Sequence, residues 1–399
     1  MKNTINYILS LSFLILIYGC SKQGCMDANA LNYDDSANKD DNSCEYTPFD
    51  KQALLTNMTE NYILPSIQEY KSKIESLDNS INNFTSNPSE ENLENVRTEW
   101  KNALLTWQDI SFINIGVADY SYLINKTNQF PADTTSIDES ISSGAWNFDN
   151  AQFNSSKGFP ALDYLLYKRG LTNSEILTNL SMENAKNYLT AISDDLLQNS
   201  IEIHDDWVSK KSEFINNNAT DLSGNESSST GESVSVIINK FCEHYEFWVR
   251  RGKLGLPLGK FNQFSGQEMP HLVECYHYGQ SLPFLIRSVE SIKKYINGFN
   301  YTTGIDGPGF DDYMDFVEAS FVNSTTSESE NLSVAINNQF DEIISKLNAL
   351  NDPLSVEVVS NKSAVEEAYE PMQDLVPKIK VDMTSALGVL ITYADNDGD

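Results

Sequence analysis

Basic side chains are scarce in this chain. Against 57 Asp and Glu residues the sequence has only 27 Lys and Arg residues, so the formal net charge is −30 at pH 7. A surface of this sign repels nucleic acid and anionic lipid headgroups at long range, which argues against nucleic acid as a partner. The excess of acidic residues favours solubility and attracts cations.

Long apolar runs are also scarce. The first, residues 8–17, follows Met1 and Lys2 and is too short to span a bilayer comfortably. These features predict a secretion signal peptide over residues 1–19. The sequence IYGC that ends at Cys20 resembles a bacterial lipobox, which predicts lipidation of Cys20 and attachment to a membrane. We therefore expect an exported cell-envelope protein, an outer-membrane lipoprotein facing the periplasm or the cell surface; the alternative is a secreted protein with one spare thiol.

Cysteine is rare, and the five residues have an informative distribution. If Cys20 is lipidated, an even number remains for an oxidising compartment: Cys25, Cys44, Cys242 and Cys275. Two disulfides are the simplest prediction. Pairing Cys25 with Cys44 and Cys242 with Cys275 keeps each bond inside its own segment, although the sequence is compatible with other pairings.

Aliphatic residues are almost absent between residues 24 and 46, so this part of the predicted spacer, residues 20–48, cannot form a core. The segment resembles a small cysteine-bracketed, Asp/Asn-rich repeat of bacterial surface proteins. Ca²⁺ takes six to eight oxygen ligands, and hard oxygen donors are plentiful here. The candidate calcium ligands are Asp27, Asn29, Asp34, Asp40 and Asp41. The alternative is a polar linker closed by a disulfide.

Sustained strand alternation is missing, whereas helical periodicity is strong from residue 49 onward. Apolar residues recur at three- and four-residue steps, and Ser89 is a predicted N-cap followed by acidic residues. An Asn/Ser/Gly-rich linker at about 216–233 divides the helices into bundles of about 49–215 and 234–399. The fold class is therefore all-α, with two packed helical bundles. Further helices are predicted at about 181–216, 233–252, 268–298, 308–320, 328–350 and 361–392.

Four stretches stand out in order along the chain: VRTEWKNALLTWQDI, GFPALDYLLY, GKLGLPLGK and ALGVLITYADNDGD. Together they resemble the imelysin family of bacterial envelope proteins, and the resemblance runs from about residue 50 to the end. It implies a helical fold of two bundles and a link to iron uptake. The family was first classed with metallopeptidases because of a Gly-x-His-x-x-Glu motif.

The corresponding motif is altered in this chain. Gly158 matches the glycine, but Pro160 stands at the histidine position and Asp163 at the glutamate position. Proline has no side-chain donor atom, so a histidine-dependent metal site cannot form there. Asp163 is left to contact a cation or Arg97, or to act as a carboxylate near a helix start. The resemblance implies a ligand-facing region formed by Gly158, Pro160 and Asp163 with Arg97 and Trp100.

Histidine is rare as well, and three of the four histidines lie near two of the cysteines. His271 and Glu274 have the i, i+3 spacing of metal ligands on one helix face, and His244 and His277 lie nearby in sequence. This set suits zinc, iron or another transition metal. The alternative is a Cys242–Cys275 disulfide that joins two helices.

The terminal sequence DNDGD resembles the start of an EF-hand loop, but the chain ends before a closing glutamate. Metal contact by Asp395, Asp397 and Asp399 would therefore need ligands from elsewhere in the fold.

The sequence shows no nucleophile triad and no phosphate-binding loop, so we expect a binding protein rather than an enzyme. The leading hypothesis is an imelysin-like envelope lipoprotein that binds a small ligand or an iron species. One alternative is a metallopeptidase that uses a metal at His271 and Glu274. Another is a surface scaffold protein with a calcium-stiffened stalk.

Overall fold

The computed structural model describes residues 21–115, 123–217, 232–262, 266–322 and 327–393. The predicted signal peptide, Cys20, most of the linker and the terminal Asp395, Asp397 and Asp399 lie outside these residues. The chain forms two compact units that divide between Phe49 and Asp50. Among the described residues, none of the helices combines the length and apolar content needed to cross a lipid bilayer.

The small N-terminal unit is held by one disulfide. Cys25 and Cys44 are bonded, with their Cα atoms 4.7 Å apart. Two short parallel strands, β1 (Gln23–Gly24) and β2 (Lys39–Asp40), complete the unit. The Cys25–Cys44 pairing predicted from the sequence is thus present.

The proposed calcium ligands of this unit make local contacts. The Asp27 carboxylate accepts a hydrogen bond from the Asn29 amide at 2.9 Å, and Asp34 forms an ion pair with Lys22 at 2.7 Å. Asp40 and Asp41 accept hydrogen bonds from the amides two residues later. These carboxylates close turns, and calcium binding stays a prediction.

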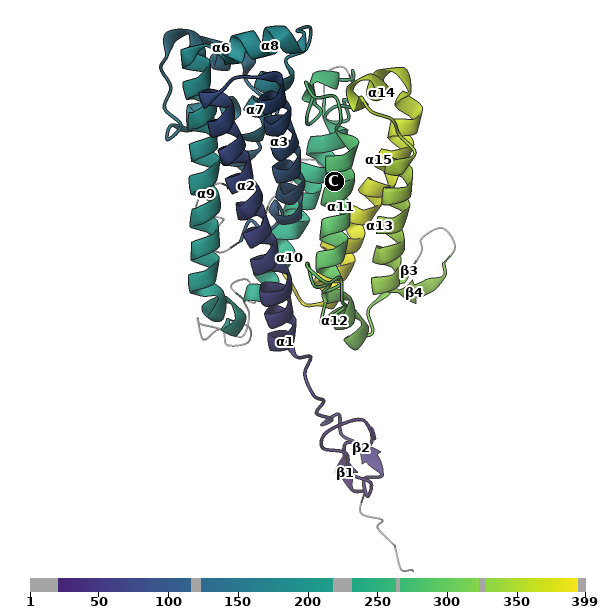
Figure 1. The fold of residues 1–399 in the computed structure, drawn as a ribbon. Helices are drawn as coiled ribbons and strands as arrows, with labels where there is room; N and C mark the ends of the chain where they lie inside the picture. Colours follow the sequence, from purple (N-terminus) through teal and green to yellow (C-terminus); the bar gives the residue numbers. More distant parts are fainter. Residues whose placement is uncertain (1–20, 116–122, 218–231, 263–265, 323–326, 394–399) are drawn as a thin grey trace, which may run out of the picture. The chain divides into compact units, whose positions relative to one another are not determined.

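The large unit is helical, as the periodicity predicts, and its first bundle is built on three long helices (Figure 1). Helix α2 packs against both α3 and α9, while α6 and α8 lie across one end. The elements of this bundle are α1 (Lys51–Thr56), the π-helix η1 (Asn57–Ile63), α2 (Leu64–Ser86), α3 (Glu90–Ile110), α5 (Leu123–Thr127), α6 (Thr134–Ser143), the 3-10 helix η2 (Ala151–Ser156), α7 (Gly158–Tyr167), α8 (Asn173–Leu180) and α9 (Glu183–Asn216).

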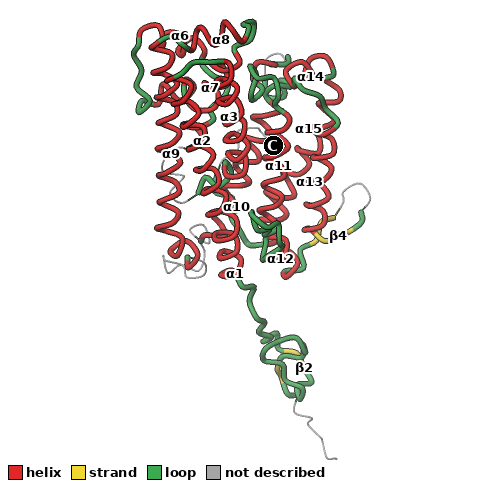
Figure 2. The backbone as a smooth tube through the Cα atoms, in the orientation of Figure 1, coloured by secondary structure: helices red, strands yellow, loops and turns green. Residues whose placement is uncertain are grey.

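The second bundle lies beside the first and is also almost entirely helical (Figure 2). Helix α11 contacts α3 of the first bundle on one side and α13 on the other, and α13 packs against α15. The elements are α10 (Ser233–His244), the π-helix η4 (Tyr245–Gly255), the 3-10 helix η5 (Pro270–Leu272), α11 (Leu282–Ile296), α12 (Phe310–Phe316), the hairpin strands β3 (Ser320–Val322) and β4 (Ser329–Asn331), α13 (Leu332–Asn348), α14 (Leu354–Ser360), α15 (Lys362–Pro377), the π-helix η6 (Lys378–Met383) and α16 (Thr384–Ala386).

Helix α3 shows how local sequence sets the helix boundaries. Ser89 is extended, and its hydroxyl accepts a hydrogen bond from the Asn92 amide at 3.2 Å, which confirms the predicted N-cap. Glu90 and Glu91 follow in the first turn, where the helix dipole favours negative charge. On the inner face Trp100 and Trp107 are fully buried.

The prediction of one helix over 268–298 is wrong in its first half. Only residues 270–272 form a 3-10 turn before α11 begins at Leu282, and the segment between them is a loop. Cys275 and Gly279 both have positive φ values, which interrupt a right-handed helix. His271 lies in the 3-10 turn and Glu274 in the loop after it, so the i, i+3 argument for a shared α-helix face does not apply to them.

The predicted Cys242–Cys275 disulfide is also absent. Both cysteines are free thiols and buried. The Cys242 thiol donates a hydrogen bond to the Ile379 carbonyl on η6, while Cys275 lies in the loop before α11. Burial raises the pKa of both thiols well above the usual value, which keeps them protonated.

Gly158, the first residue of α7, occupies a position that only glycine fits. Its φ is +69°, and a Cβ at this position would lie 2.2 Å from the Thr127 carbonyl oxygen. The chain therefore needs glycine both for the left-handed conformation and for the close approach of α5. Pro160 follows in the first turn of α7, where the absence of an amide hydrogen costs no helical bond.

Replacing Gly158 with alanine should destabilise the large unit by about 3 kcal/mol, because backbone strain and a backbone clash act together. Gly170 is a matched control, since its φ is +87° but a Cβ at that position would meet nothing within 4 Å. Gly170→Ala should cost only the strain, about 1 kcal/mol. Urea unfolding of both variants measures the difference, and equal losses would contradict the role assigned to the Thr127 contact.

Candidate functional site

The family-like segment and the loop before α11 meet at one cavity. Its volume is about 270 Å³, and it lies where α3 and α7 of the first bundle face residues 271–277 of the second. Most of the wall is aromatic or apolar, with a few polar groups. The lining residues are Trp100, Leu104, Asn128, Phe130, Pro131, Ala132, Thr134, Phe159, Pro160, Asp163, His271, Val273, Glu274, Cys275, Tyr276 and His277.

Asp163 connects the two sides of this cavity. Its carboxylate accepts hydrogen bonds from the backbone amides of His277 at 3.0 Å and Tyr278 at 2.8 Å. Burial raises the pKa of Asp163 to about 7, while these two amides act in the opposite direction. These hydrogen bonds attach residues 271–278 to α7. This role of Asp163 differs from that of a carboxylate near a helix start.

Arg97 and Trp100 both donate hydrogen bonds to backbone carbonyls of α7. The Arg97 guanidinium donates to the Leu166 carbonyl at the end of α7, with Nε at 3.0 Å. Trp100 Nε1 donates to the Phe159 carbonyl at 3.2 Å near the start of the same helix. Of the two, only Trp100 lines the cavity. The contact between Arg97 and Asp163, one of the options that the sequence left open, is not formed, because Arg97 bonds to Leu166 and Asp163 to the amides of His277 and Tyr278.

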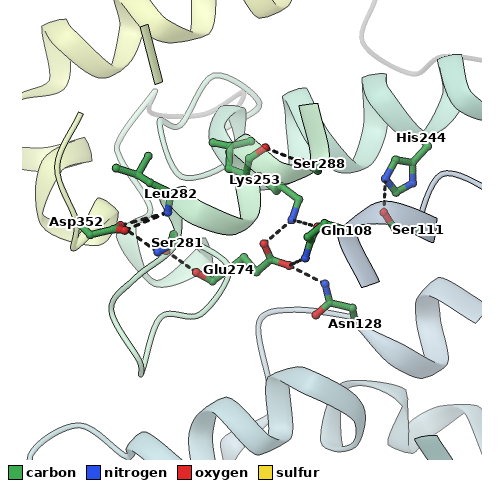
Figure 3. Close-up of polar contacts among 11 residues, drawn as sticks. Gln108, Ser111, Asn128, His244, Lys253, Glu274, Ser281, Leu282, Ser288 and Asp352 are labelled. Atoms are coloured by element: carbon green, nitrogen blue, oxygen red, sulfur yellow. Dashed lines mark hydrogen bonds and ion pairs between the residues drawn. The ribbon is translucent and has the colours of Figure 1, made fainter. Parts of the chain in front are cut away.

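A buried ion pair lies next to the cavity, and one of its two members, Glu274, lines it. Figure 3 shows the polar contacts of this pair. Lys253 of η4 pairs with Glu274, and both side chains are almost fully buried. Gln108 and Asn128 of the first bundle donate to Glu274 Oε1 at 3.2 Å and 2.7 Å, and Lys253 also donates to Gln108 Oε1 at 2.9 Å. Each buried charge is thus matched by a partner and by hydrogen bonds, as burial requires.

The structure does not assemble the predicted metal-ligand set. His271, Glu274 and His277 line the cavity, but the Glu274 carboxylate is engaged by Lys253, and His244 lies instead beside Ser111 with its Nε2 3.1 Å from the Ser111 hydroxyl. Among the residues described, no group of three or more His, Cys, Asp and Glu side chains is arranged to hold a metal ion. Pro160 supplies no ligand atom, so the family motif does not provide a metal site either.

The carboxyl-terminal end of α3 contacts three different parts of the second bundle. Gln108 reaches Lys253 and Glu274, whereas Asp109 receives a bidentate contact from Arg287 at 2.6 and 2.8 Å. Ser111 reaches His244, whose pKa is lowered to about 3 by burial and then by the positive charge of Lys253. We call these residues the polar seam: Gln108, Asp109, Ser111, Asn128, His244, Lys253, Glu274 and Arg287.

His277 is one of the polar groups that line the cavity. Burial and the nearby Arg169 lower the pKa of His277 to about 4, so this imidazole is neutral at pH 7. Its Nδ1 is buried and has no hydrogen-bond partner in the described part of the chain. Aromatic walls with a few polar groups are typical of small-molecule sites. The two carboxylates that line the cavity, those of Asp163 and Glu274, are already bonded to other groups of the protein.

The fold and the cavity define an all-α protein of two bundles with a small-molecule-sized cavity where they meet. The sequence model of the imelysin family matches residues 63–380. Since this match covers most of the chain, the protein belongs to the imelysin family. No curated relative matches it in sequence.

Two solved structures have a similar fold. One is a putative iron-regulated protein A precursor from Parabacteroides distasonis ATCC 8503, with a TM-score of 0.68 and 17% identity over 86% of this chain and 96% of that one. The other is an imelysin-like protein from Psychrobacter arcticum 273-4, with a TM-score of 0.62 and 14% identity over 86% of this chain and 97% of that one. At these identities the likeness concerns the fold.

The sequence-based predictions did not include the polar seam, although some of its residues stand out in the sequence. Gln108 and Asp109 interrupt the apolar stripe of α3 at its inner end, and Lys253 stands in the apolar stretch GKLG. Polar residues at positions that periodicity assigns to the core are candidates for buried, paired groups. Which of them pair depends on the packing of the bundles.

The raised pKa of Asp163 predicts a pH dependence of stability. Between about pH 4 and pH 7 the folded state holds this proton while the unfolded state has lost it, so the contribution of Asp163 to the free energy of unfolding falls as pH rises through this window. Burial also raises the pKa of Asp311 to about 7, which adds a contribution of the same sign, whereas the lowered pKa values of His244 and His277 contribute with the opposite sign. Asp163→Asn should therefore shift the slope of the free energy of unfolding against pH toward more positive values.

Chemical unfolding at several pH values between 4 and 7 measures this slope. Asp206→Asn is the control, because Asp206 is an exposed aspartate of α9 and its replacement changes the net charge equally. This variant should keep the slope of the wild type. An unchanged slope in Asp163→Asn would contradict the assignment.

Proposed function

We propose that this protein is an exported binding protein of the cell envelope, anchored through a lipid on Cys20, that takes a small ligand in the cavity between its bundles and contributes to iron uptake. The ligand is an iron species or a small molecule that carries one. The proposal treats iron as cargo and assigns the chain no peptidase chemistry.

The cavity is the observation that carries this proposal. It is lined by Trp100, Phe130, Phe159 and Tyr276, and it contains the neutral imidazole of His277 with an unpartnered nitrogen among the residues described. A preformed aromatic cavity with few polar groups suits ligand binding. Peptidase chemistry would need an activated water at a metal or a free carboxylate base. The carboxylates of Asp163 and Glu274 are both engaged in holding the fold.

The link to iron and the location rest on resemblance. The Parabacteroides protein of similar fold is described as iron-regulated and as a precursor, which supports export of this chain as well. The apolar segment at residues 8–17 and the lipobox-like IYGC support the lipid anchor. The net charge of −30 is compatible with a cationic or metal-bearing ligand.

Thermal unfolding of the mature protein, with ferric citrate and haem titrated separately, tests the proposal. A ligand that binds the folded state at about 100 times its Kd should add about 2.7 kcal/mol and raise the Tm. Ala132→Trp, which places an indole at the partly exposed edge of the cavity, should abolish the increase.

The matched control is Ala145→Trp, which adds the same side chain at an exposed position that does not line the cavity. This variant should respond to the ligand as the wild type does. The proposal fails if neither probe raises the Tm, or if Ala132→Trp retains the full response.

A further inference from the structure

A second cavity lies on another side of the end of α3. Its volume is about 230 Å³, and it is bounded by Asp109 of α3, by one face of α11 and by the loop after α11. Arg287, Ser291 and Lys294 of α11 line it at i, i+4 and i+7, which places them along one side of that helix. This cavity shares no lining residue with the cavity between Trp100 and His277.

The hydrogen-bond acceptors of Asp109 are fully used at this cavity. Oδ1 accepts from Arg287 Nε at 2.6 Å and from the Ser291 hydroxyl at 2.5 Å. Oδ2 accepts from Arg287 Nη2 at 2.8 Å and from the Tyr301 hydroxyl at 3.0 Å. The carboxylate is almost completely buried, so these partners neutralise its charge and leave no acceptor for a ligand.

Arg287, in contrast, keeps one edge available. A guanidinium has five N–H donors in a planar fork, and Asp109 takes only those of the Nε–Nη2 edge. Among the described residues, Nη1 has no hydrogen-bond partner, and the side chain is one-third exposed. The edge formed by Nη1 and Nη2 has the geometry that binds a carboxylate with two parallel hydrogen bonds. Because Asp109 fixes the other edge, this donor pair is held in place before a ligand arrives.

Two more donors face the same space. Lys294 is exposed and has no partner within the described ranges. The Asn300 side-chain oxygen accepts from the amides of Thr302 at 3.0 Å and Thr303 at 2.9 Å, which orients its amide group and leaves the Nδ2 donor unbonded in the described structure. With one carboxylate against two cations, the cavity has a local charge of about +1 on a strongly acidic chain.

The remaining wall is aromatic. The rings of Tyr62 and Tyr301 stand edge to face with their centroids 5.6 Å apart, and Phe299 also lines the cavity. Tyr62 is buried and donates to the carbonyls of Asp109 and Ser291, so its ring is held against α3 and α11. A flat apolar group would pack against these rings with little loss of freedom.

We propose that this cavity is a binding site for a small monocarboxylate that carries a flat apolar group. The carboxylate pairs with the free edge of Arg287 and with Lys294, and the apolar part packs on Tyr62, Tyr301 and Phe299. A single negative charge matches the local charge of the site. The proposal concerns a second site and does not depend on iron binding in the other cavity.

Isothermal titration calorimetry with benzoate tests this site on the mature protein at low ionic strength. Benzoate should bind, and benzyl alcohol, which has the same ring without the charge, should bind at least about tenfold more weakly because it forms no charge-assisted bonds. Lys294→Gln should weaken benzoate binding about tenfold, and Lys294→Arg should restore most of it.

Lys210→Gln is the matched control, since Lys210 is an exposed lysine of α9 and its replacement changes the net charge equally. This variant should bind benzoate like the wild type. The proposal is overturned if benzoate gives no binding heat at about 10 mM, a concentration that detects a millimolar Kd. It is overturned as well if Lys294→Gln binds like Lys210→Gln, or if inorganic phosphate binds more tightly than benzoate.

Discussion

Burial of charge at the end of α3 is the constraint on which the large unit depends. Asp109, Glu274 and Lys253 are each at most 5% exposed, and the effective penalty for removing each such ion from water is several kcal/mol. The penalty is offset only when every charge has a partner and its remaining donors and acceptors are bonded. The polar seam meets this condition only when the two bundles are in register, since its partners come from both. Apolar packing alone would tolerate other registers.

Residues of the polar seam also line both cavities. Gln108 bonds to both Lys253 and Glu274, of which Glu274 lines the first cavity, and two turns earlier on the same helix Trp100 forms part of the cavity wall. Asp109, the next residue after Gln108, fixes Arg287 at the second cavity. Consecutive residues on a helix point in different directions, so one turn of α3 serves two separate spaces. Asp163 then closes the first space by holding the loop of residues 271–278.

The sequence predicted the fold well and the site only in part. Three- and four-residue periodicity and the Ser89 cap follow from local chemistry, and the bounds of α9 were predicted within two residues. The first part of the helix predicted over residues 268–298 does not form. Cys275 and Gly279 have positive φ values there, which tertiary packing requires and apolar periodicity does not reveal.

The family resemblance singled out the segment that contains Pro160 and Asp163, and the structure places both residues at a cavity. Ligand binding there stays a prediction. The partners of Asp163 are backbone amides, which have no signature in sequence. The side chains of the polar seam are visible in the sequence, but their pairing across two bundles is not.

A double-mutant cycle on Lys253 and Glu274 tests most directly whether the charges buried in the polar seam stabilise the large unit only when they are paired. Glu274→Gln keeps the shape of the side chain but leaves Lys253 buried without a counter-charge, so it should cost about 3–5 kcal/mol of unfolding free energy. Lys253→Met should cost a similar amount, and the double variant should be more stable than either single variant because no unpaired charge remains. Single losses below about 1 kcal/mol that simply add in the double variant would be typical of a solvated surface pair and would contradict the account.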